Sequence, residues 1–169
     1  AGIPRRIGYD RKMGFLLTAR VKHTKQLGEK HELDYNLQLL SPLGIVLKDK
    51  RLYMPLRPEA EIWAKSLLLQ EGVKETDKLL AIHPGASCPS KIWPNERFAE
   101  VADRLKEKYG FKTIIISGPK DIKRAEAVLA KMRSQALDLA GKTSLTQLAS
   151  LLKRCSLFIS NDSGPVHIA

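Results

Sequence analysis

From residue 78 onward, short apolar segments alternate with longer segments whose apolar residues recur at helical spacing. The apolar segments have the length of buried strands, and they cover residues 79–83, 113–117, 137–140 and 157–160. The segments between them are predicted to be helices, and they cover residues 95–109, 121–133 and 144–155. Strands joined by helices in this order form parallel β–α–β units. The predicted fold class is therefore α/β, with an open parallel sheet.

The first 75 residues carry a less regular pattern. Two short strands are expected at residues 6–9 and 52–56, and two helices at residues 31–43 and 58–71. Residues 72–77 read as a linker, so we place a domain boundary here, between residues 1–74 and residues 75–169. The chain begins with Ala1 and stops at Ala169 inside a predicted helix, which suggests a piece of a longer protein.

Composition excludes several classes of protein. All apolar runs are much shorter than the roughly 18 residues of a membrane-spanning helix, and the N-terminus lacks the pattern of a signal peptide. Two cysteines, Cys88 and Cys155, are too few for a disulfide framework or a four-ligand zinc site. No histidine pair or acidic pair has the spacing of a metal site. These features are typical of a cytosolic protein without a bound metal.

The net charge is strongly positive and unevenly distributed. The 29 Lys and Arg residues exceed the 18 Asp and Glu residues by 11, and residues 1–30 hold eight basic residues against two acidic ones. Such a segment is either a solvated face or a surface that attracts phosphate groups, an acidic membrane or nucleic acid. Nucleic acid is disfavoured because aromatic residues make up only 6% of the chain and no known reader motif is present.

The loops that follow the four regular strands share one composition. They are rich in Gly, Ser, Thr and Pro, and they cover residues 83–87, 118–121, 141–144 and 161–167. The turns at the opposite edge of the predicted sheet read as ordinary solvated turns. Because open parallel sheets bind ligands at the carboxyl ends of their strands, these four loops predict a binding site at that edge.

The last of these loops has the features of an anion site. Pro165 favours the first turn of a helix, so the hydroxyl of Ser163 and the N–H groups near Gly164 would lie at a helix N-terminus. His167 in the same turn is a candidate hydrogen-bond donor to phosphate. Lys91 is expected to lie close to the carboxyl end of the strand predicted at residues 79–83, and it is a candidate to neutralise a phosphate as a point charge.

The segment Gly141-Lys142-Thr143 resembles part of a phosphate-binding P-loop, but the pattern fails. A P-loop requires a glycine five residues before its second glycine, and position 136 is alanine. Lys142 is therefore expected to be solvated, although the N–H groups that begin the next helix can still contact a ligand.

Four motifs stand in order along residues 78–169. They are His83-Pro-Gly-Ala-Ser, Lys91-Ile-Trp-Pro, Asp138-Leu-Ala-Gly-Lys-Thr-Ser-Leu and Asp162-Ser-Gly-Pro-Val-His-Ile-Ala. In order and spacing they closely resemble glycosyltransferase family 9, the ADP-heptose:lipopolysaccharide heptosyltransferases of Gram-negative bacteria. Residues 1–75 resemble the later part of that family's N-terminal domain, through Arg6-Ile-Gly and the helix before Gly44.

The resemblance implies a two-domain glycosyltransferase of the B type. Residues 75–169 would belong to a Rossmann-like C-terminal domain that holds the nucleotide sugar, and residues 1–74 to the end of the N-terminal acceptor domain. Family members transfer heptose with inversion from ADP-heptose to the lipopolysaccharide inner core, and no cofactor is implied beyond this donor. The implied location is the cytoplasm, at the cytoplasmic face of the inner membrane.

The resemblance also assigns site residues. Lys91 matches a phosphate-binding, catalytically important lysine, Asp121 lies near the contact to ribose, and Thr143 matches a residue of the adenine pocket. The other nucleotide-sugar-binding residues are Ala86, Ser87, Asp162, Ser163, Gly164 and His167. The family's general base is an aspartate after the first strand of the N-terminal domain, and no residue of this sequence occupies that place. The chain alone is therefore expected to be inactive.

Three alternatives remain open from the sequence. A B-type glycosyltransferase with another sugar donor would share the fold, because pocket details rather than the fold decide the donor. A nucleotide-sugar-binding module without transfer activity is consistent with the missing base. A basic nucleic-acid-binding protein is the third reading.

Overall fold

The computed structural model describes residues 2–169, which divide into two compact units. The first unit ends at Tyr53, and the second comprises Met54–Ala169. This division falls earlier than the expected boundary between residues 74 and 75. The reason is that helix α2 (Pro58–Gln70) packs against helix α5 (Leu145–Arg154) of the second unit.

The second unit is built on a four-stranded parallel sheet. Its strands are β3 (Leu79–His83), β4 (Lys112–Ser117), β5 (Ala136–Ala140) and β6 (Leu157–Ser160). They lie in the order β5-β4-β3-β6, and every pair is parallel, as the sequence pattern predicted. The chain moves outward from β3 to β5 and then returns to the other side of β3. The loops after β3 and β6 therefore flank the switch point at which such sheets bind ligands.

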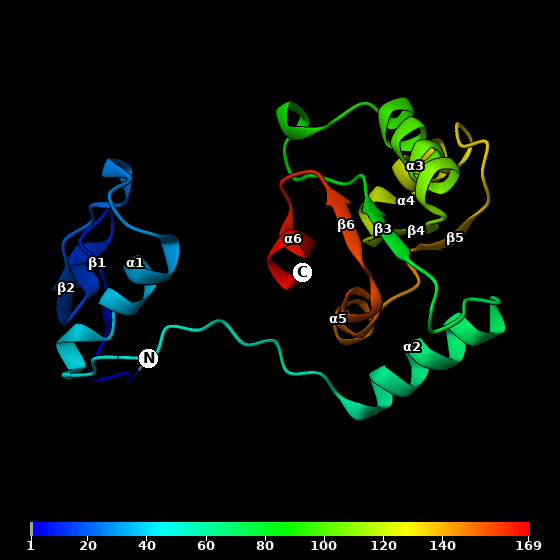
Figure 1. Cartoon of the computed structure of the whole chain (residues 1–169). Helices are drawn as coiled ribbons and strands as arrows, with labels where there is room; N and C mark the ends of the chain where they lie inside the picture. The colour runs from blue at the N-terminus through cyan, green and yellow to red at the C-terminus, as the bar shows by residue number, and fades with distance from the viewer. Residues whose placement is uncertain (1) are drawn as a thin grey trace. The chain divides into compact units, whose positions relative to one another are not determined.

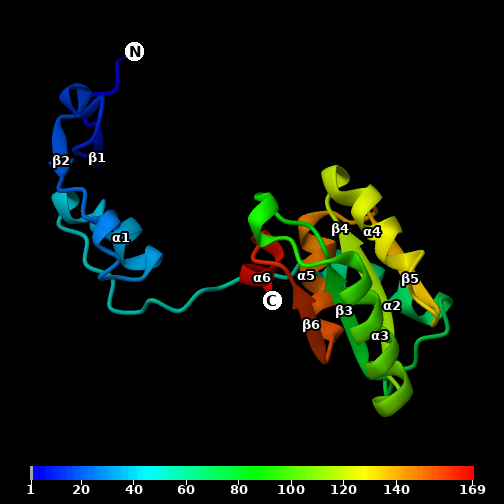
Figure 2. The same ribbon diagram turned by 90° about the horizontal axis from the view of Figure 1, so that it is seen from above.

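Helices cover both faces of this sheet (Figures 1 and 2). Helices α3 (Asn95–Tyr109) and α4 (Ile122–Leu129) cover one face, with Phe98 and Val128 packed on Leu80 and Ile82 of β3. Helices α2 and α5 cover the other, with Leu68 and Leu151 packed on its Leu79 and Ala81. Alternate residues of β3 thus enter opposite cores, which explains why the strand is apolar along its whole length.

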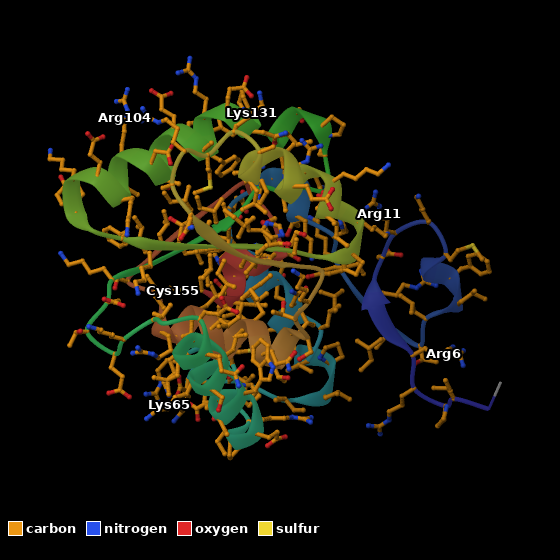
Figure 3. The ribbon with its side chains drawn as sticks, turned by 90° about the vertical axis from the view of Figure 1, so that its right-hand side faces the viewer. Arg6, Arg11, Lys65, Arg104, Lys131 and Cys155 are labelled. Carbon is orange, nitrogen blue, oxygen red and sulfur yellow. The ribbon has the colours of Figure 1, made fainter. Side chains whose placement is uncertain are left out.

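The charged faces of the covering helices point into solvent. Figure 3 shows Arg104 of α3 and Lys131, just beyond α4, projecting away from the sheet, and Lys65 projecting from α2. Helix α3 is followed by Gly110, whose φ of 73° is a left-handed conformation that favours glycine. Helix α5 begins with the predicted capping box, in which Ser144 and Gln147 exchange side-chain and backbone hydrogen bonds.

The first unit contains a small parallel pair and one short α-helix. Strands β1 (Ile7–Tyr9) and β2 (Ala19–Val21) pair in parallel, and helix α1 (Glu32–Gln38) follows them. Tyr35 of α1 is buried, and its hydroxyl donates to the backbone oxygen of Thr24 at 3.2 Å. Tyr9 in turn donates its hydroxyl to the backbone oxygen of Tyr35, which ties α1 to the strand pair.

Several predicted elements differ from the structure. The expected strand at residues 52–56 is wrong: all of residues 51–57 are described, and they form neither strand nor helix. The expected helix at residues 31–43 ends at Gln38 and is followed by the 3₁₀ turn Ser41–Leu43, whereas strand β2 was not predicted. The expected helix at residues 121–133 ends at Leu129, because the N–H groups of Arg133 and Ser134 donate to the carboxylate of Asp103 instead.

Among residues 2–169, no helix has both the length and the apolar character that a bilayer crossing requires.

Candidate nucleotide-sugar site

A cavity of about 790 Å³ opens at the carboxyl edge of the four-stranded sheet. All four of the Gly- and Ser-rich loops contribute to its wall. The contributing residues are His83 at the end of β3, with Ala86 and Ser87 after it; Gly118 to Asp121 after β4; Thr143 and Ser144 after β5; and Ser163, Gly164 and Pro165 after β6. Apolar side chains, among them Ile116 and Leu148, complete it. The cavity combines an apolar wall with several hydroxyl groups, which is typical of a site for a small organic ligand.

Six of the nine predicted site residues meet at this cavity. They are Ala86, Ser87, Asp121, Thr143, Ser163 and Gly164. Lys91, Asp162 and His167 are not among the described residues that line it. His167 lies in the short helix α6 (Gly164–Ile168) and is exposed.

Lys91 and Asp162 instead pair with each other. Lys91 ends the 3₁₀ helix Pro89–Lys91, and its Nζ atom lies 2.5 Å from Oδ2 of Asp162 in the loop after β6. The hydrogen bond between them raises the pKa of Lys91 and lowers the pKa of Asp162, so each group holds the other in its charged form. The Lys91 side chain is 45% exposed and that of Asp162 is 65% exposed, so the ion pair lies open to solvent and to dissolved ions.

Asn161 joins the same two loops from inside the protein. Its side chain is buried, donates through Nδ2 to the backbone oxygen of Pro84 at 2.8 Å, and accepts from the backbone N–H of Trp93 at 3.0 Å. The Trp93 ring packs edge-to-face on Phe98 of α3, with 5.0 Å between ring centroids. These contacts fix the segment that carries Lys91 relative to the end of β6.

The absence of a side chain at Gly85 lets Asp121 approach the loop after β3. A Cβ atom built at Gly85 would lie 2.6 Å from Oδ2 of Asp121 and 2.9 Å from Cε1 of His83. Asp121 also lies 3.9 Å from the guanidinium of Arg124. Glycine in this motif therefore serves close packing, since its φ is not in the left-handed region.

His83 is a residue of the cavity wall that sequence reasoning did not select. Its side chain is only 6% exposed, and its Nδ1 atom lies 3.2 Å from Oγ of Ser163. Burial lowers the pKa of His83, and the nearby charge of Asp121 opposes that shift. The available signal was its position as the last residue of β3, the first residue of a loop that faces the ligand edge.

Lys142, which the sequence analysis expected to be solvated, forms two contacts with Asp138 of β5. The Nζ atom of Lys142 donates to the backbone oxygen of Asp138 at 2.9 Å and pairs with its carboxylate at 3.0 Å, so this lysine is bound to β5 and does not line the cavity.

Ser117 lines the cavity, and its buried hydroxyl has no hydrogen-bond partner among the described residues. Within residues 2–169, no group of three or more His, Cys, Asp and Glu side chains is arranged to hold a metal ion.

Known proteins resemble this chain along its full length. The family model described as glycosyltransferase family 9 (heptosyltransferase) matches residues 1–169. Lipopolysaccharide heptosyltransferase 2 of Salmonella typhimurium is 28% identical over 100% of this chain and 51% of its own length. Lipopolysaccharide heptosyltransferase 3 of Escherichia coli K12 is 29% identical over 87% of this chain and 43% of its own length. The chain thus spans about half the length of the curated relatives it matches.

Solved structures share the fold. The crystal structure of the glycosyl transferase family 9 from Veillonella parvula has a TM-score of 0.84 at 30% identity, and it is matched over 99% of this chain and 48% of that one. The structure of the ADP-heptose heptosyltransferase II of E. coli has a TM-score of 0.73 at 23% identity, over 99% of this chain and 53% of that one, a likeness that bears on fold alone. The predicted α/β fold is confirmed by these matches.

Proposed function

Because the chain belongs to glycosyltransferase family 9 and has the B-type fold of that family, we propose that this protein transfers heptose from ADP-heptose to the lipopolysaccharide inner core. The observation that carries this proposal is the convergence of four polar loops on one cavity at the carboxyl edge of the sheet. Such an edge is where open parallel sheets bind nucleotides. The cavity volume of about 790 Å³ is in the range of ordinary small-molecule sites.

The proposed donor position assigns each part of ADP-heptose to part of the cavity wall. The adenine lies near Thr143, where Leu145 and Leu148 supply apolar contact surface. The ribose hydroxyls lie near the carboxylate of Asp121. The diphosphate lies near Ser163 and Gly164 and near Ala86 and Ser87 of the same cavity wall, where small side chains leave room for phosphate oxygens.

The proposed reaction is an inverting displacement. An acceptor hydroxyl attacks the anomeric carbon of the heptose, a new C–O bond forms, and the bond to the diphosphate breaks so that ADP leaves. Negative charge grows on the leaving diphosphate in the transition state. Lys91 would exchange Asp162 for that diphosphate and stabilise the charge, and the Ser163 hydroxyl would donate to it.

The base that takes the proton of the acceptor hydroxyl is not assigned to a residue of this sequence. The proposal therefore gives residues 54–169 the donor half of the reaction, and we propose that the 169-residue chain alone binds donor without turning it over. The basic first unit would contribute to the acceptor side, where lipopolysaccharide carries phosphate and carboxylate groups. We further propose a cytoplasmic location, at the cytoplasmic face of the inner membrane.

Isothermal titration calorimetry tests the proposal, with ADP, ADP-heptose and UDP-sugars as titrants. We expect ADP and ADP-heptose to bind and UDP-sugars to bind much more weakly. Binding of UDP-sugars without binding of ADP compounds would indicate a B-type glycosyltransferase with another donor. Binding of ADP-heptose without transfer by the protein that carries the acceptor domain and its base would indicate a binding module.

A further inference from the structure

Hydrogen bonds at the ends of β3 and β6 connect buried His83 to the wall of the cavity. His83 is the last residue of β3 and pairs in register with Ser160, the last residue of β6. Its Nδ1 atom lies 3.2 Å from Oγ of Ser163 and 3.5 Å from Oγ of Ser160. The two serine hydroxyls are 3.0 Å apart. An imidazole, two hydroxyls and the cavity surface are therefore linked within one small cluster.

The proton of Ser160 is already committed in this cluster. Its Oγ atom donates to the backbone oxygen of Asn161 at 2.7 Å, and a serine hydroxyl has only one proton. Toward Ser163, Ser160 can therefore only accept. The oxygen of Ser163 in turn accepts from His83 when Nδ1 carries the ring proton. In that arrangement the Ser163 proton is the one hydroxyl proton of the cluster that can turn into the cavity.

We propose that His83 is a positioning residue, whose Nδ1–H donates to Ser163 and holds that hydroxyl ready to turn its proton from Ser160 to an anionic oxygen in the cavity. This inference rests on the proposed function, which puts a diphosphate beside Ser163. His83 acts through Ser163 and does not itself contact the ligand. A hydroxyl that accepts from an imidazole is a stronger donor, and its orientation is set before the ligand arrives.

The charge around His83 gives this role a signature in pH. The charged side chain that faces the imidazole is Asp121, from the loop after β4. Burial lowers the pKa of His83 and Asp121 partly opposes this, so the ring is neutral at pH 7 and carries one proton on its two nitrogens. An anionic ligand beside Ser163 favours a second ring proton. Ligand binding should therefore be linked to proton uptake by His83 at acid pH.

Calorimetry with ADP as the probe tests the positioning role with four variants of the cluster and one control variant. His83→Leu fills the space without a hydrogen bond, whereas His83→Asn keeps a polar donor close to the position of Nδ1. We expect His83→Leu and Ser163→Ala each to weaken ADP binding about tenfold, and the double variant His83→Leu/Ser163→Ala to weaken it no further than Ser163→Ala alone, because His83 acts only through the Ser163 hydroxyl. His83→Asn should recover most of the affinity. Ser150→Ala, which removes a buried hydroxyl of α5 outside the cavity, is the control and should bind normally.

The pH profile separates positioning from a structural role. Titration of the ADP phosphate affects every variant alike, so the comparison of wild type with His83→Asn isolates the imidazole. The wild type should gain affinity relative to His83→Asn as the pH falls from about 8 to about 5. Identical profiles would overturn the proposal, and this comparison still decides it if His83→Leu fails to fold. If the wild type binds ADP and His83→Leu binds equally well, only the role of His83 is rejected; if the wild type does not bind ADP, the proposed function is rejected with it.

Discussion

The ammonium group of Lys91 and the carboxylate of Asp162, 71 positions apart in the sequence, form an ion pair between the loops that follow β3 and β6. Neither side chain lines the cavity, although the family resemblance assigns both to the nucleotide-sugar site. The structure thus presents the proposed catalytic lysine with its charge already paired by a protein carboxylate. A donor diphosphate must displace Asp162, or share Lys91 with it, before the lysine can stabilise a leaving group.

Substitution of Lys91 should therefore affect turnover far more than stability. In a protein with acceptor-transfer activity, we expect Lys91→Ala to lower kcat by about 10²-fold or more, the scale of losing one preorganised stabilising charge. Lys91→Arg should retain part of the rate, because it keeps the charge but not the compact shape. Steady-state kinetics measure the effect, and thermal unfolding serves as the control. An unchanged kcat would mean that Lys91 only pairs with Asp162 at the surface.

A methyl group at position 85 should displace Asp121 from the cavity wall. The Cβ of Gly85→Ala would stand 2.6 Å from Oδ2 of Asp121, closer than nonbonded atoms approach. If that carboxylate binds the ribose, ADP affinity should fall about 10- to 100-fold, the value of a hydrogen bond to a charged group. In an Asp121→Ala background, Gly85→Ala should reduce ADP affinity much less. Equal affinity of Gly85→Ala and wild type, measured by calorimetry, would contradict this role of the glycine.

Asp103 of α3 should contribute to stability in a way that acid removes. Its carboxylate, 7% exposed, accepts from the N–H and hydroxyl of Ser134 and from the N–H of Arg133. Burial raises the pKa of Asp103, but these hydrogen bonds outweigh that effect and leave the pKa below its ordinary value of 3.8. The stabilisation is therefore present above that ordinary pKa and is lost as the pH falls through the lower folded value.

Urea unfolding can measure this contribution. At neutral pH we expect Asp103→Ala to lower the free energy of unfolding by about 1–3 kcal/mol, because four donors, the guanidinium Nε of Arg133 among them, lose their buried acceptor. Asp103→Asn should lower the free energy of unfolding less than Asp103→Ala does. Its stability should also lack the decline that the wild type shows in acid, since an amide does not titrate in this range. If the stability of the wild type and that of Asp103→Asn fall in parallel below pH 4, the Asp103 carboxylate is not responsible for the loss of stability in acid.

The basic first unit should attract the acceptor, and the structure shows which residues can test this. Arg6 is engaged locally, because its guanidinium donates to the backbone oxygens of Ile3 and Leu16, so it is a poor choice for charge reversal. Arg5, Arg11 and Lys12 are exposed, and Figure 3 marks Arg6 and Arg11 on this unit. In a protein with acceptor-transfer activity, changing these three to Glu should raise the acceptor KM about tenfold at low salt and leave ADP affinity unchanged.

Salt provides the internal control for that experiment. The Debye length of about 8 Å at physiological ionic strength means that added salt should raise the acceptor KM of the wild type. The acceptor KM of the charge-reversed variant should rise less with added salt. The same salt dependence in both proteins would identify residues 1–30 as a solvated face.

The α/β part of the fold, from residue 78 onward, could be predicted because the local apolar patterns and helix caps agreed with the parallel sheet that they form. Apolar runs such as Leu79–His83 became central strands, and Ser144 began a helix with the expected capping box. The strand expected at residues 52–56 failed because apolar composition does not supply a pairing partner: Leu52 is 74% exposed and Tyr53 is 85% exposed. The end of α4 could not be read from periodicity, since a carboxylate 30 residues away captures the backbone N–H groups there.

The site was predictable as a set of loops but not as a set of contacts. Loop composition and sheet topology were sufficient to bring Ser87, Asp121 and Thr143 to one cavity. The pairing of Lys91 with Asp162 and the burial of His83 against Ser163 depend on the register between β3 and β6. Sequence spacing contains no measure of that register, so these relationships appear only in the folded chain.

The position of β6 beside β3 also has a consequence for the order of folding. The contacts of the site span long stretches of chain: 68 residues from Trp93 to Asn161, 71 from Lys91 to Asp162, and 80 from His83 to Ser163. Long loops are closed late and slowly in folding, whereas β3, β4 and α3 can assemble from neighbouring segments. During synthesis, the central strand must wait with one edge unpaired until residues 157–160 have been made. Docking of that strand pairs the second edge of β3 and brings Ser163 to the cavity wall, so a nascent chain acquires this part of its ligand-binding surface only after a contact between distant segments has formed.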